Sequence, residues 1–388
     1  MNWFRLIAQE LRLALGDTSC RLVLFGSVFI YAFFYPYPYS PEVQNNVPVV
    51  VVDQDQTSLS RQLIRMVDAG DRSRVTRRAL SFDEAKSLCE KGEVQAILLI
   101  PGDFEKRVLK GGKVELSVWI DATCFFTYRQ VTTGLLTTVR TLAAGIEIKR
   151  FRAKGMSEGA AMAAMDPLPL QVTQLFNPSG GYGTYIVPMV FILILHQTLF
   201  LGVGMVAGGR REAGDRSWFV ASPGLSGAVS MVSAKVAAYL LLYSIHALFY
   251  FGVLHRFYDF VERGAVFDMM IFMGVFLTAV ILLALALSAC FQHRENSLFM
   301  LLFTSLPMVF LSGISWPVES IPSLLRVLSL AIPGTAGIDG FMRIATMGST
   351  LGDVLLDVQV LAGLCLVYFV LATLIFYKNG QSEEMETS

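Results

Sequence analysis

The sequence is poor in charged residues and in residues that bind metals. Of its 388 residues 16% are charged, whereas soluble globular proteins carry about 25%. Its four histidines are scattered, and its five cysteines lack metal-ligand spacing. The 31 basic and 31 acidic residues cancel, so no excess of positive charge indicates nucleic-acid binding. What remains is a chain that is 54% hydrophobic, with a mean hydropathy of +0.55. Because the charge deficit lies in discrete runs, it indicates a polytopic membrane protein.

Motifs for nucleotide binding and catalysis are also missing. The Gly112-Lys113 pair lacks the glycine five residues earlier that a phosphate-binding loop needs. The histidines show no Ser-His-Asp or zinc spacing. A membrane enzyme, for example a lipid-modifying one, would need clustered His, Asp or Glu at the membrane interface, and the sequence has no such cluster. We therefore expect no catalytic residue, no metal and no cofactor on this chain.

Long apolar runs predict six transmembrane helices, because about 20 apolar residues span the hydrocarbon core of a bilayer. The chain is organised around residues 184–223, where an uncharged run is followed by a charged stretch and then by a second apolar run. The spans are expected at residues 21–39, 184–207, 228–254, 267–291, 297–312 and 358–377.

Residues outside these spans take three forms. Residues 1–20 predict an amphipathic interfacial helix whose apolar residues are Trp3, Phe4, Ile7, Leu11 and Leu15. Residues 313–357 are semi-polar and broken by prolines and glycines, so a re-entrant or interfacial segment is expected there. The tail, 378–388, is polar and is predicted to be disordered.

Residues 40–183 form a large polar region of a different kind. Strands expected at 48–53, 94–101 and 114–121 alternate with helices at 57–69, 81–91 and 103–109. A long helical stretch, 125–165, then leads back toward the second span. This alternation predicts an α/β domain. Cys89 and Cys124 both lie in it, and the sequence leaves open whether they form a disulfide. The predicted fold is a polytopic α-helical membrane protein with an extracytoplasmic α/β domain inserted between the first and second spans.

Basic residues near the spans predict the orientation. On the side of the termini lie Arg5, Arg12, Arg21, Arg210, Arg211, Arg216, Arg294 and Lys378. On the opposite side lie Arg256, Arg263, Arg326 and Arg343. Cytoplasmic loops carry the excess of Lys and Arg, so both termini and the 208–224 loop are expected in the cytoplasm.

The 208–224 loop is the strongest candidate site. The sequence leaves two alternatives open. The segment is either a solvated loop that only connects two spans or a docking element for a cytoplasmic partner. Mixed charge beside Trp218 and Phe219 is what an interface anchor in a polar rim uses. The residues concerned are Arg210, Arg211, Glu212, Gly214, Asp215, Trp218 and Phe219.

Polar residues within the spans form a second candidate group. His196, Gln197 and His246 make interhelical hydrogen bonds, or they line a substrate path. Lys235 is expected to extend its ammonium group to the membrane surface. The Gly204–Gly208 pair permits close helix packing, as at a dimer interface.

Four segments, in this order, resemble the membrane subunit of ABC-2 type transporters, in the branch with a large external domain after the first span. They are YPYPYSPEVQNNVPVVVVDQDQTSLSRQL, VQAILLIPGDF, REAGDRSWFVASP and SGISWPVESIPSLLRVLSLAIPGTAGIDGF. Together they are spread over most of the chain, from Tyr35 to Phe341. Within the third, Glu212 and Gly214 match the cytoplasmic loop of the family, but Asp215 stands where threonine is usual and no glutamate follows at the usual place.

The resemblance implies partners that composition does not show. A cytoplasmic ABC ATPase subunit would bind ATP and Mg²⁺ and drive export, docking on the 208–224 loop and the N-terminal helix. The permease would pair with a second copy or a paralogue. This branch is typical of bacterial inner membranes, where a periplasmic adaptor and an outer-membrane channel are further partners beside membrane lipid.

The expected function is therefore export of a hydrophobic or amphipathic molecule, such as a drug, a lipid or a peptide. The alternative is a membrane-anchored receptor or cell-envelope scaffold that works without an ATPase.

Overall fold

The computed structural model describes residues 2–219 and 224–387. The chain divides into two compact units. Residues 1–42 and 174–388 form the helical unit, and residues 43–173 form the sheet unit. Each unit has a hydrophobic core of its own.

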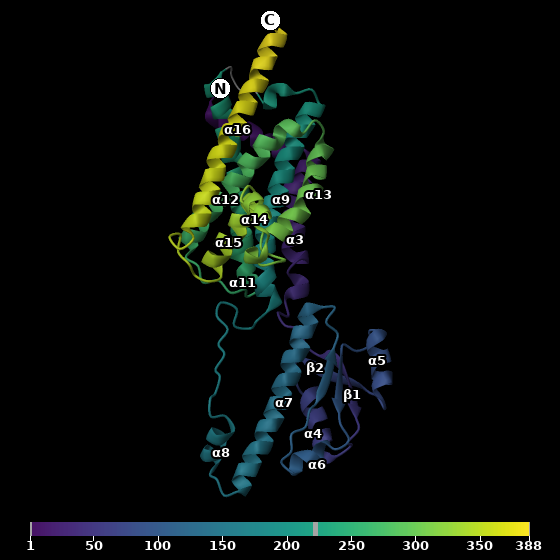
Figure 1. Cartoon of the computed structure of the whole chain (residues 1–388). Helices are drawn as coiled ribbons and strands as arrows, with labels where there is room; N and C mark the ends of the chain where they lie inside the picture. Colours follow the sequence, from purple (N-terminus) through teal and green to yellow (C-terminus); the bar gives the residue numbers. More distant parts are fainter. Residues whose placement is uncertain (1, 220–223, 388) are drawn as a thin grey trace. The chain divides into compact units, whose positions relative to one another are not determined.

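The helical unit is a bundle (Figure 1). Its helices are α1 (Trp3–Gly16), α2 (Thr18–Arg21), α3 (Val28–Phe34), α9 (Tyr182–Glu212), α10 (Leu225–Ala247), α11 (His255–Phe257), α12 (Val266–Leu287), α13 (Arg294–Leu311), α14 (Ser323–Ser329), α15 (Pro333–Ala345) and α16 (Leu355–Thr387). The π-helical segments η1 (Leu22–Ser27) and η4 (Leu248–Leu254) join α2 to α3 and α10 to α11. Figure 1 shows α1 and the C-terminal end of α16 at the same end of this unit.

Five helices among the described residues are long and apolar enough to cross a membrane. They are Thr18–Tyr39, Tyr182–Glu212, Leu225–Phe257, Val266–Cys290 and Leu355–Gln381. A sixth is added if α14 and α15, which meet at 87°, count as one broken span. That bend falls where a re-entrant or interfacial segment is expected. The fifth predicted span, 297–312, corresponds to α13, which is not among the five because Arg294, Glu295 and Asn296 occupy its first turn.

Two helices extend further than the sequence predicts. Helix α9 continues to Glu212 without a break, so Arg210, Arg211 and Glu212 lie on its last turn rather than in a loop. Cationic side chains are favourable at a helix C-terminus, and the left-handed turn at Gly214 follows directly. Helix α16 continues to Thr387, although the tail is expected to be disordered. Gln, Glu and Met in this tail are good helix formers, and they extend a helix that is already nucleated.

The sheet unit contains a four-stranded sheet in the order β2-β1-β3-β4. Its strands are β1 (Val47–Asp53), β2 (Ser73–Arg78), β3 (Ala96–Ile100) and β4 (Ser117–Ile120). β1 pairs in parallel with β2 and β3, and β4 is antiparallel to β3. The helices are α4 (Ser58–Asp68), α5 (Phe82–Glu90), α6 (Phe104–Leu109), α7 (Phe125–Ala153) and α8 (Glu158–Met165).

Both faces of β1 are buried, which explains its unbroken run of valines. Val49 and Val51 contribute to the core under α4 and α7, whereas Val50 and Val52 contribute to the core under α5. The structure adds one strand to this unit, divides one predicted helix and answers the question of the disulfide. The sequence did not indicate β2, because its SRVTRR residues are mostly polar and suit an edge strand. The long helix predicted for 125–165 is interrupted at Gly155, whose φ is +86°. All five cysteines, Cys89 and Cys124 included, are free.

Candidate functional site

The predicted docking segment lies at the end of α9, and the structure describes it as far as Phe219. We call residues 210–219 the tip. Gly208, Gly209 and Gly224 of the predicted 208–224 loop are also described. Residues 220–223 of this loop lie outside the described residues. At the tip the chain turns after Gly214, whose φ is +71°, a left-handed conformation that glycine adopts readily.

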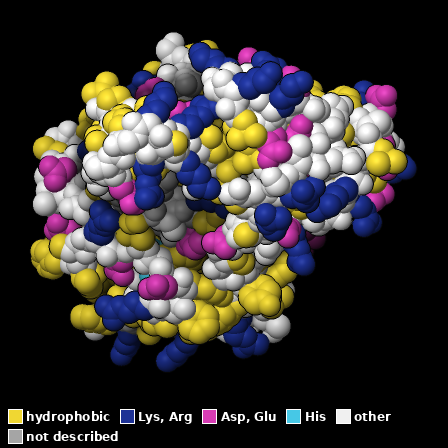
Figure 2. Space-filling model, turned by 90° about the horizontal axis from the view of Figure 1, so that it is seen from below, with side chains coloured by type: hydrophobic (Ala, Val, Ile, Leu, Met, Phe, Trp, Pro, Cys, Tyr) yellow, Lys and Arg dark blue, Asp and Glu magenta, His cyan; other side chains and the backbone are white. Residues whose placement is uncertain are grey.

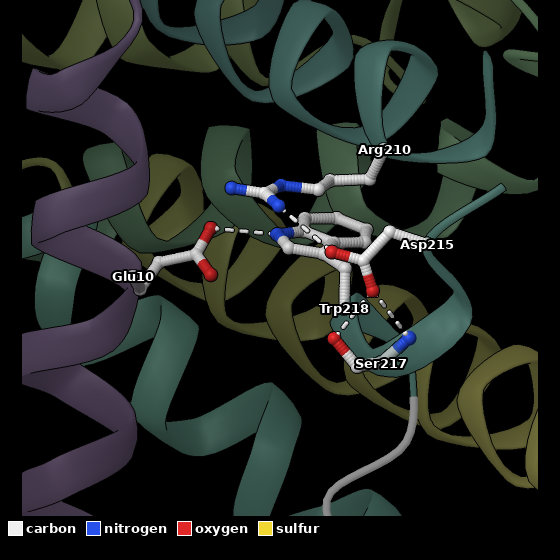
Figure 3. Close-up of polar contacts among 5 residues, drawn as sticks. All are labelled: Glu10, Arg210, Asp215, Ser217 and Trp218. Atoms are coloured by element: carbon white, nitrogen blue, oxygen red, sulfur yellow. Dashed lines mark hydrogen bonds and ion pairs between the residues drawn. The ribbon is translucent and has the colours of Figure 1, made fainter. Parts of the chain in front are cut away.

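The outer part of the tip is solvent-exposed and held by one carboxylate. Glu212, Gly214 and Ser217 are exposed. The Asp215 carboxylate accepts hydrogen bonds from the Ser217 hydroxyl at 2.5 Å and backbone N–H at 3.0 Å, and from the Arg210 guanidinium at 2.7 Å (Figure 3). The Ser217 hydroxyl bond and the Arg210 guanidinium lower the pKa of Asp215 below its usual value. The exposed turn is therefore a fixed shape rather than a loose loop.

The inner part of the tip is buried, which corrects the expectation of exposed aromatic anchors. Trp218 is 2% and Phe219 3% exposed. Both rings contact Phe376 of α16, with centroids 5.5 and 5.3 Å away. Arg211 places its guanidinium 4.4 Å from the Phe219 ring centroid and donates to the backbone oxygen of Ala289 at 2.9 Å. These aromatic rings attach the tip to the bundle and are not available to a partner.

A buried carboxylate, Glu10 of α1, joins the tip to the membrane-spanning helices. It is 3% exposed. One of its oxygens accepts hydrogen bonds from the indole N–H of Trp218 at 3.1 Å and from the Tyr239 hydroxyl at 2.8 Å. The other oxygen pairs with the Lys235 ammonium at 2.5 Å. Figure 3 shows Glu10 pointing from α1 toward the indole of Trp218. We call these four residues the Glu10 cluster.

Lys235 lies inside the cluster instead of reaching the membrane surface. It is 2% exposed, and its nitrogen lies 3.7 Å from the centroid of the Trp218 ring. A lysine in this position is stabilised by the Glu10 charge and by a cation–π contact. Removing one partner of such a pair leaves an uncompensated buried charge, which typically costs about 3–5 kcal/mol. The Glu10 cluster therefore fixes α1, the tip and α10 to one another.

Helix α1 packs one face against the bundle. Its buried residues are Leu6, Glu10 and Ala14, spaced four apart and packed toward α10. Phe4, predicted on the apolar face, is 71% exposed. The amphipathic helix is present, and the polar side predicted from its sequence includes the buried Glu10.

A second ion pair ties the N-terminal segment to α13. The Asp17 carboxylate pairs with Arg294 at 2.6 Å and accepts the backbone N–H of Cys20 at 3.0 Å. The Cys20 backbone bond and Arg294 lower the pKa of Asp17. These residues line a small polar cavity that also includes Arg210. The start of the first span is thus ion-paired with α13, and it shares this cavity with Arg210 of the tip.

The structure places His196 and Gln197 on α9 and His246 on α10. His196 and His246 are buried, and among the described residues neither ring has a hydrogen-bond partner, so these two histidines form no interhelical hydrogen bond there. His196 stacks on Phe276, with a ring separation of 6.3 Å, and Gln197 is half-buried. The hydrogen bond between α9 and α10 comes instead from Tyr243, which donates to Thr198 (the separation is 3.1 Å).

The glycine pair of α9 packs against α13 of the same chain. A Cβ atom on Gly204 would lie 2.6 Å from the Ser297 Cβ, and one on Gly208 would lie 2.4 Å from the His293 backbone oxygen. Such distances are shorter than real contacts, so only glycine permits this approach.

Sequence reasoning missed the Glu10 cluster, although one signal was present. Lys235 lies within a long apolar run, and an ionisable residue at such a position usually has a partner. Its partner is 225 residues away and lies on another element. Among the described residues, no group of three or more His, Cys, Asp and Glu side chains could hold a metal.

Comparison with known proteins identifies a family. The model of the family described as "ABC-2 family transporter protein" matches residues 20–374, which include the tip, the whole sheet unit and most of the helical unit, but not Glu10. No curated protein matches the chain.

Proposed function

Because the chain belongs to the ABC-2 transporter family, we propose that it is the permease subunit of an ATP-driven exporter in the bacterial inner membrane. A separate cytoplasmic ATPase subunit binds ATP and Mg²⁺ and docks at the tip. The cargo is a hydrophobic or amphipathic molecule. A second copy of the chain or a paralogue completes the transporter, and a periplasmic adaptor with an outer-membrane channel extends the route.

The observation that carries this proposal is the division of the tip into an exposed turn and a buried anchor. Glu212 and Gly214 are open to a partner, whereas Trp218 is buried against Glu10. Interiors pack densely and transmit displacement rather than absorbing it. Movement imposed on the exposed turn is therefore passed to α9 directly, and to α1 and α10 through the Glu10 cluster. A solvated loop that only satisfied topology would need no such anchor.

The proposed orientation places the tip and both termini in the cytoplasm. This orientation rests on the excess of Lys and Arg near those ends of the spans that lie on the same side as the tip. The sheet unit is then periplasmic and relays cargo outward. In the same proposal, cargo passes close to α9 and α10, where His196, Gln197 and His246 provide polar groups within an apolar surrounding.

The first test is purification of the tagged chain from membranes in mild detergent, with mass spectrometry and an ATP hydrolysis assay on the eluate. A stoichiometric nucleotide-binding subunit with vanadate-sensitive hydrolysis is the expected result. A folded chain that is repeatedly recovered alone, without hydrolysis and without an ATPase gene beside its own, would favour the receptor or scaffold alternative.

A second test is Glu212→Arg. Glu212 is exposed on the last turn of α9, so the substitution leaves the packed interior unchanged. We expect membrane insertion to persist while ATPase activity is uncoupled from transport. Glu115→Arg, at an exposed position of the sheet unit, makes the same charge change away from the tip and should transport normally. Normal transport by Glu212→Arg would contradict docking at this turn.

A further inference from the structure

A cavity of about 180 Å³ lies between α10, η4, α12 and α15, away from the tip. Its wall is almost entirely apolar and includes Met269, Met273, Phe251 and Phe341. The lining residues of α12 extend from Val266 to Leu277, which is about 16 Å at 1.5 Å rise per residue. The cavity is therefore a narrow slot along the helices and suits a chain-like apolar ligand.

The rim of the cavity belongs to the exposed surface of two candidate spans. Leu248, Val266 and Met270 line it and are 53–58% exposed. The helices that carry them are among the five that can cross a membrane. One wall is the π-helical segment η4; π-helical turns are rare and frequently occur at functional sites. Because the rim opens on the hydrocarbon region, the molecule with the readiest access is a membrane lipid.

Two opposite charges stand at one end of the slot. Arg256 lies in α11 at the end of its span, and Glu262 follows in the connection to α12. Burial raises the pKa of Glu262, and the nearby Arg256 opposes that rise. The end of a span is the depth of lipid headgroups. A guanidinium binds phosphate well, and a carboxylate binds an ammonium group.

We propose that this cavity is a binding site for a zwitterionic phospholipid. One acyl chain occupies the apolar slot, the phosphate contacts Arg256 and the headgroup amine contacts Glu262. The site is separate from the tip and its occupation does not depend on ATP hydrolysis, so the proposal goes beyond the exporter function and stands without it.

Two glycines make the test possible. A Cβ atom added at Gly252 or Gly274 meets no atom within 4 Å, and both residues line the cavity. Gly274→Leu is therefore designed to place a side chain in the slot. Gly363→Leu is the matched control, because Gly363 lies in another candidate span and also has open space around its Cβ.

The experiment is native mass spectrometry of the purified full-length protein offered phosphatidylethanolamine or phosphatidylglycerol with identical acyl chains. We expect the wild type and Gly363→Leu to retain phosphatidylethanolamine preferentially. Gly274→Leu should lose bound lipid at an unchanged thermal midpoint, and Glu262→Gln should retain lipid but lose the preference for the amine headgroup.

Other results would overturn the proposal. Lipid retention by Gly274→Leu equal to that of the wild type would show that the slot is not the binding site. Equal retention of both lipids by the wild type would refute the headgroup assignment. A wild-type dimer that Gly274→Leu converts to a monomer, with no loss of lipid, would show that a second copy of the chain covers this face.

Discussion

Removing one charge of the Glu10–Lys235 pair should destabilise the helical unit more than removing both. Glu10→Gln leaves the Lys235 ammonium buried without a counter-charge, and Lys235→Met leaves the Glu10 carboxylate with only the neutral donors of Trp218 and Tyr239. Each single change is expected to cost about 3–5 kcal/mol. In the double variant no buried charge remains, and the Gln oxygen still accepts from Trp218 and Tyr239. The double variant should therefore be more stable than either single variant.

Thermal unfolding in detergent, followed by tryptophan fluorescence, measures this order. For a domain of about 150–250 residues, one kcal/mol shifts the midpoint by roughly 2–4 °C, so each single variant should lose roughly 6–20 °C. The control is the Lys86–Glu90 pair of the sheet unit, whose side chains are 61% and 66% exposed. Such exposed helix pairs contribute only about 0.3–0.5 kcal/mol, so Lys86→Met and Glu90→Gln should change the midpoint little.

If the losses of stability in the two single variants simply add in the double variant, the proposed charge compensation is refuted. Additivity would mean that Glu10 and Lys235 do not compensate each other in the folded protein. It would also remove the link by which movement of the tip is proposed to reach α10.

Three further predictions concern other contacts. Gly208→Ala should lower the unfolding midpoint, because its Cβ would lie 2.4 Å from the His293 backbone oxygen, and an unchanged midpoint would contradict the close packing. Glu42→Ala should lower the free energy of unfolding by about 0.5–2 kcal/mol, because the Glu42 carboxylate caps α9 by accepting hydrogen bonds from the Thr184 backbone N–H and hydroxyl. Glu42→Gln, measured in the same assay, should restore part of this stability. The lowered pKa of Asp215 means that its contribution to stability is present above about pH 3.9 and is lost as pH falls through the folded-state pKa. Asp215→Asn should therefore be less stable than the wild type at neutral pH but less sensitive to acid, and equal acid sensitivity would argue against the role of this carboxylate.

Local patterns in the sequence were enough to predict most elements. Apolar runs located five of the six predicted spans, because a bilayer requires about 20 apolar residues per helix whatever the neighbouring chain does. The alternation of strands and helices predicted β1, β3 and β4: β1 and β3 have continuous apolar runs, and β4 contains Val118, Trp119 and Ile120. Element ends were less predictable. Helix α9 continues through charged residues to Glu212, since a helix end depends on the turn that follows it.

Contacts between distant residues were decided by the tertiary structure alone. Hydrophobicity places Glu10 on the polar side of α1 and Trp218 in an exposed anchor, yet the two side chains meet in the interior, 208 positions apart in sequence. Burying a carboxylate is favourable only if donors surround it, and the donors here come from the tip and α10. No property of any one segment specifies that meeting, because it depends on how α1, α9 and α10 pack. The sequence by itself determined that this chain spans a membrane, and the packing determined which of its charges are held inside.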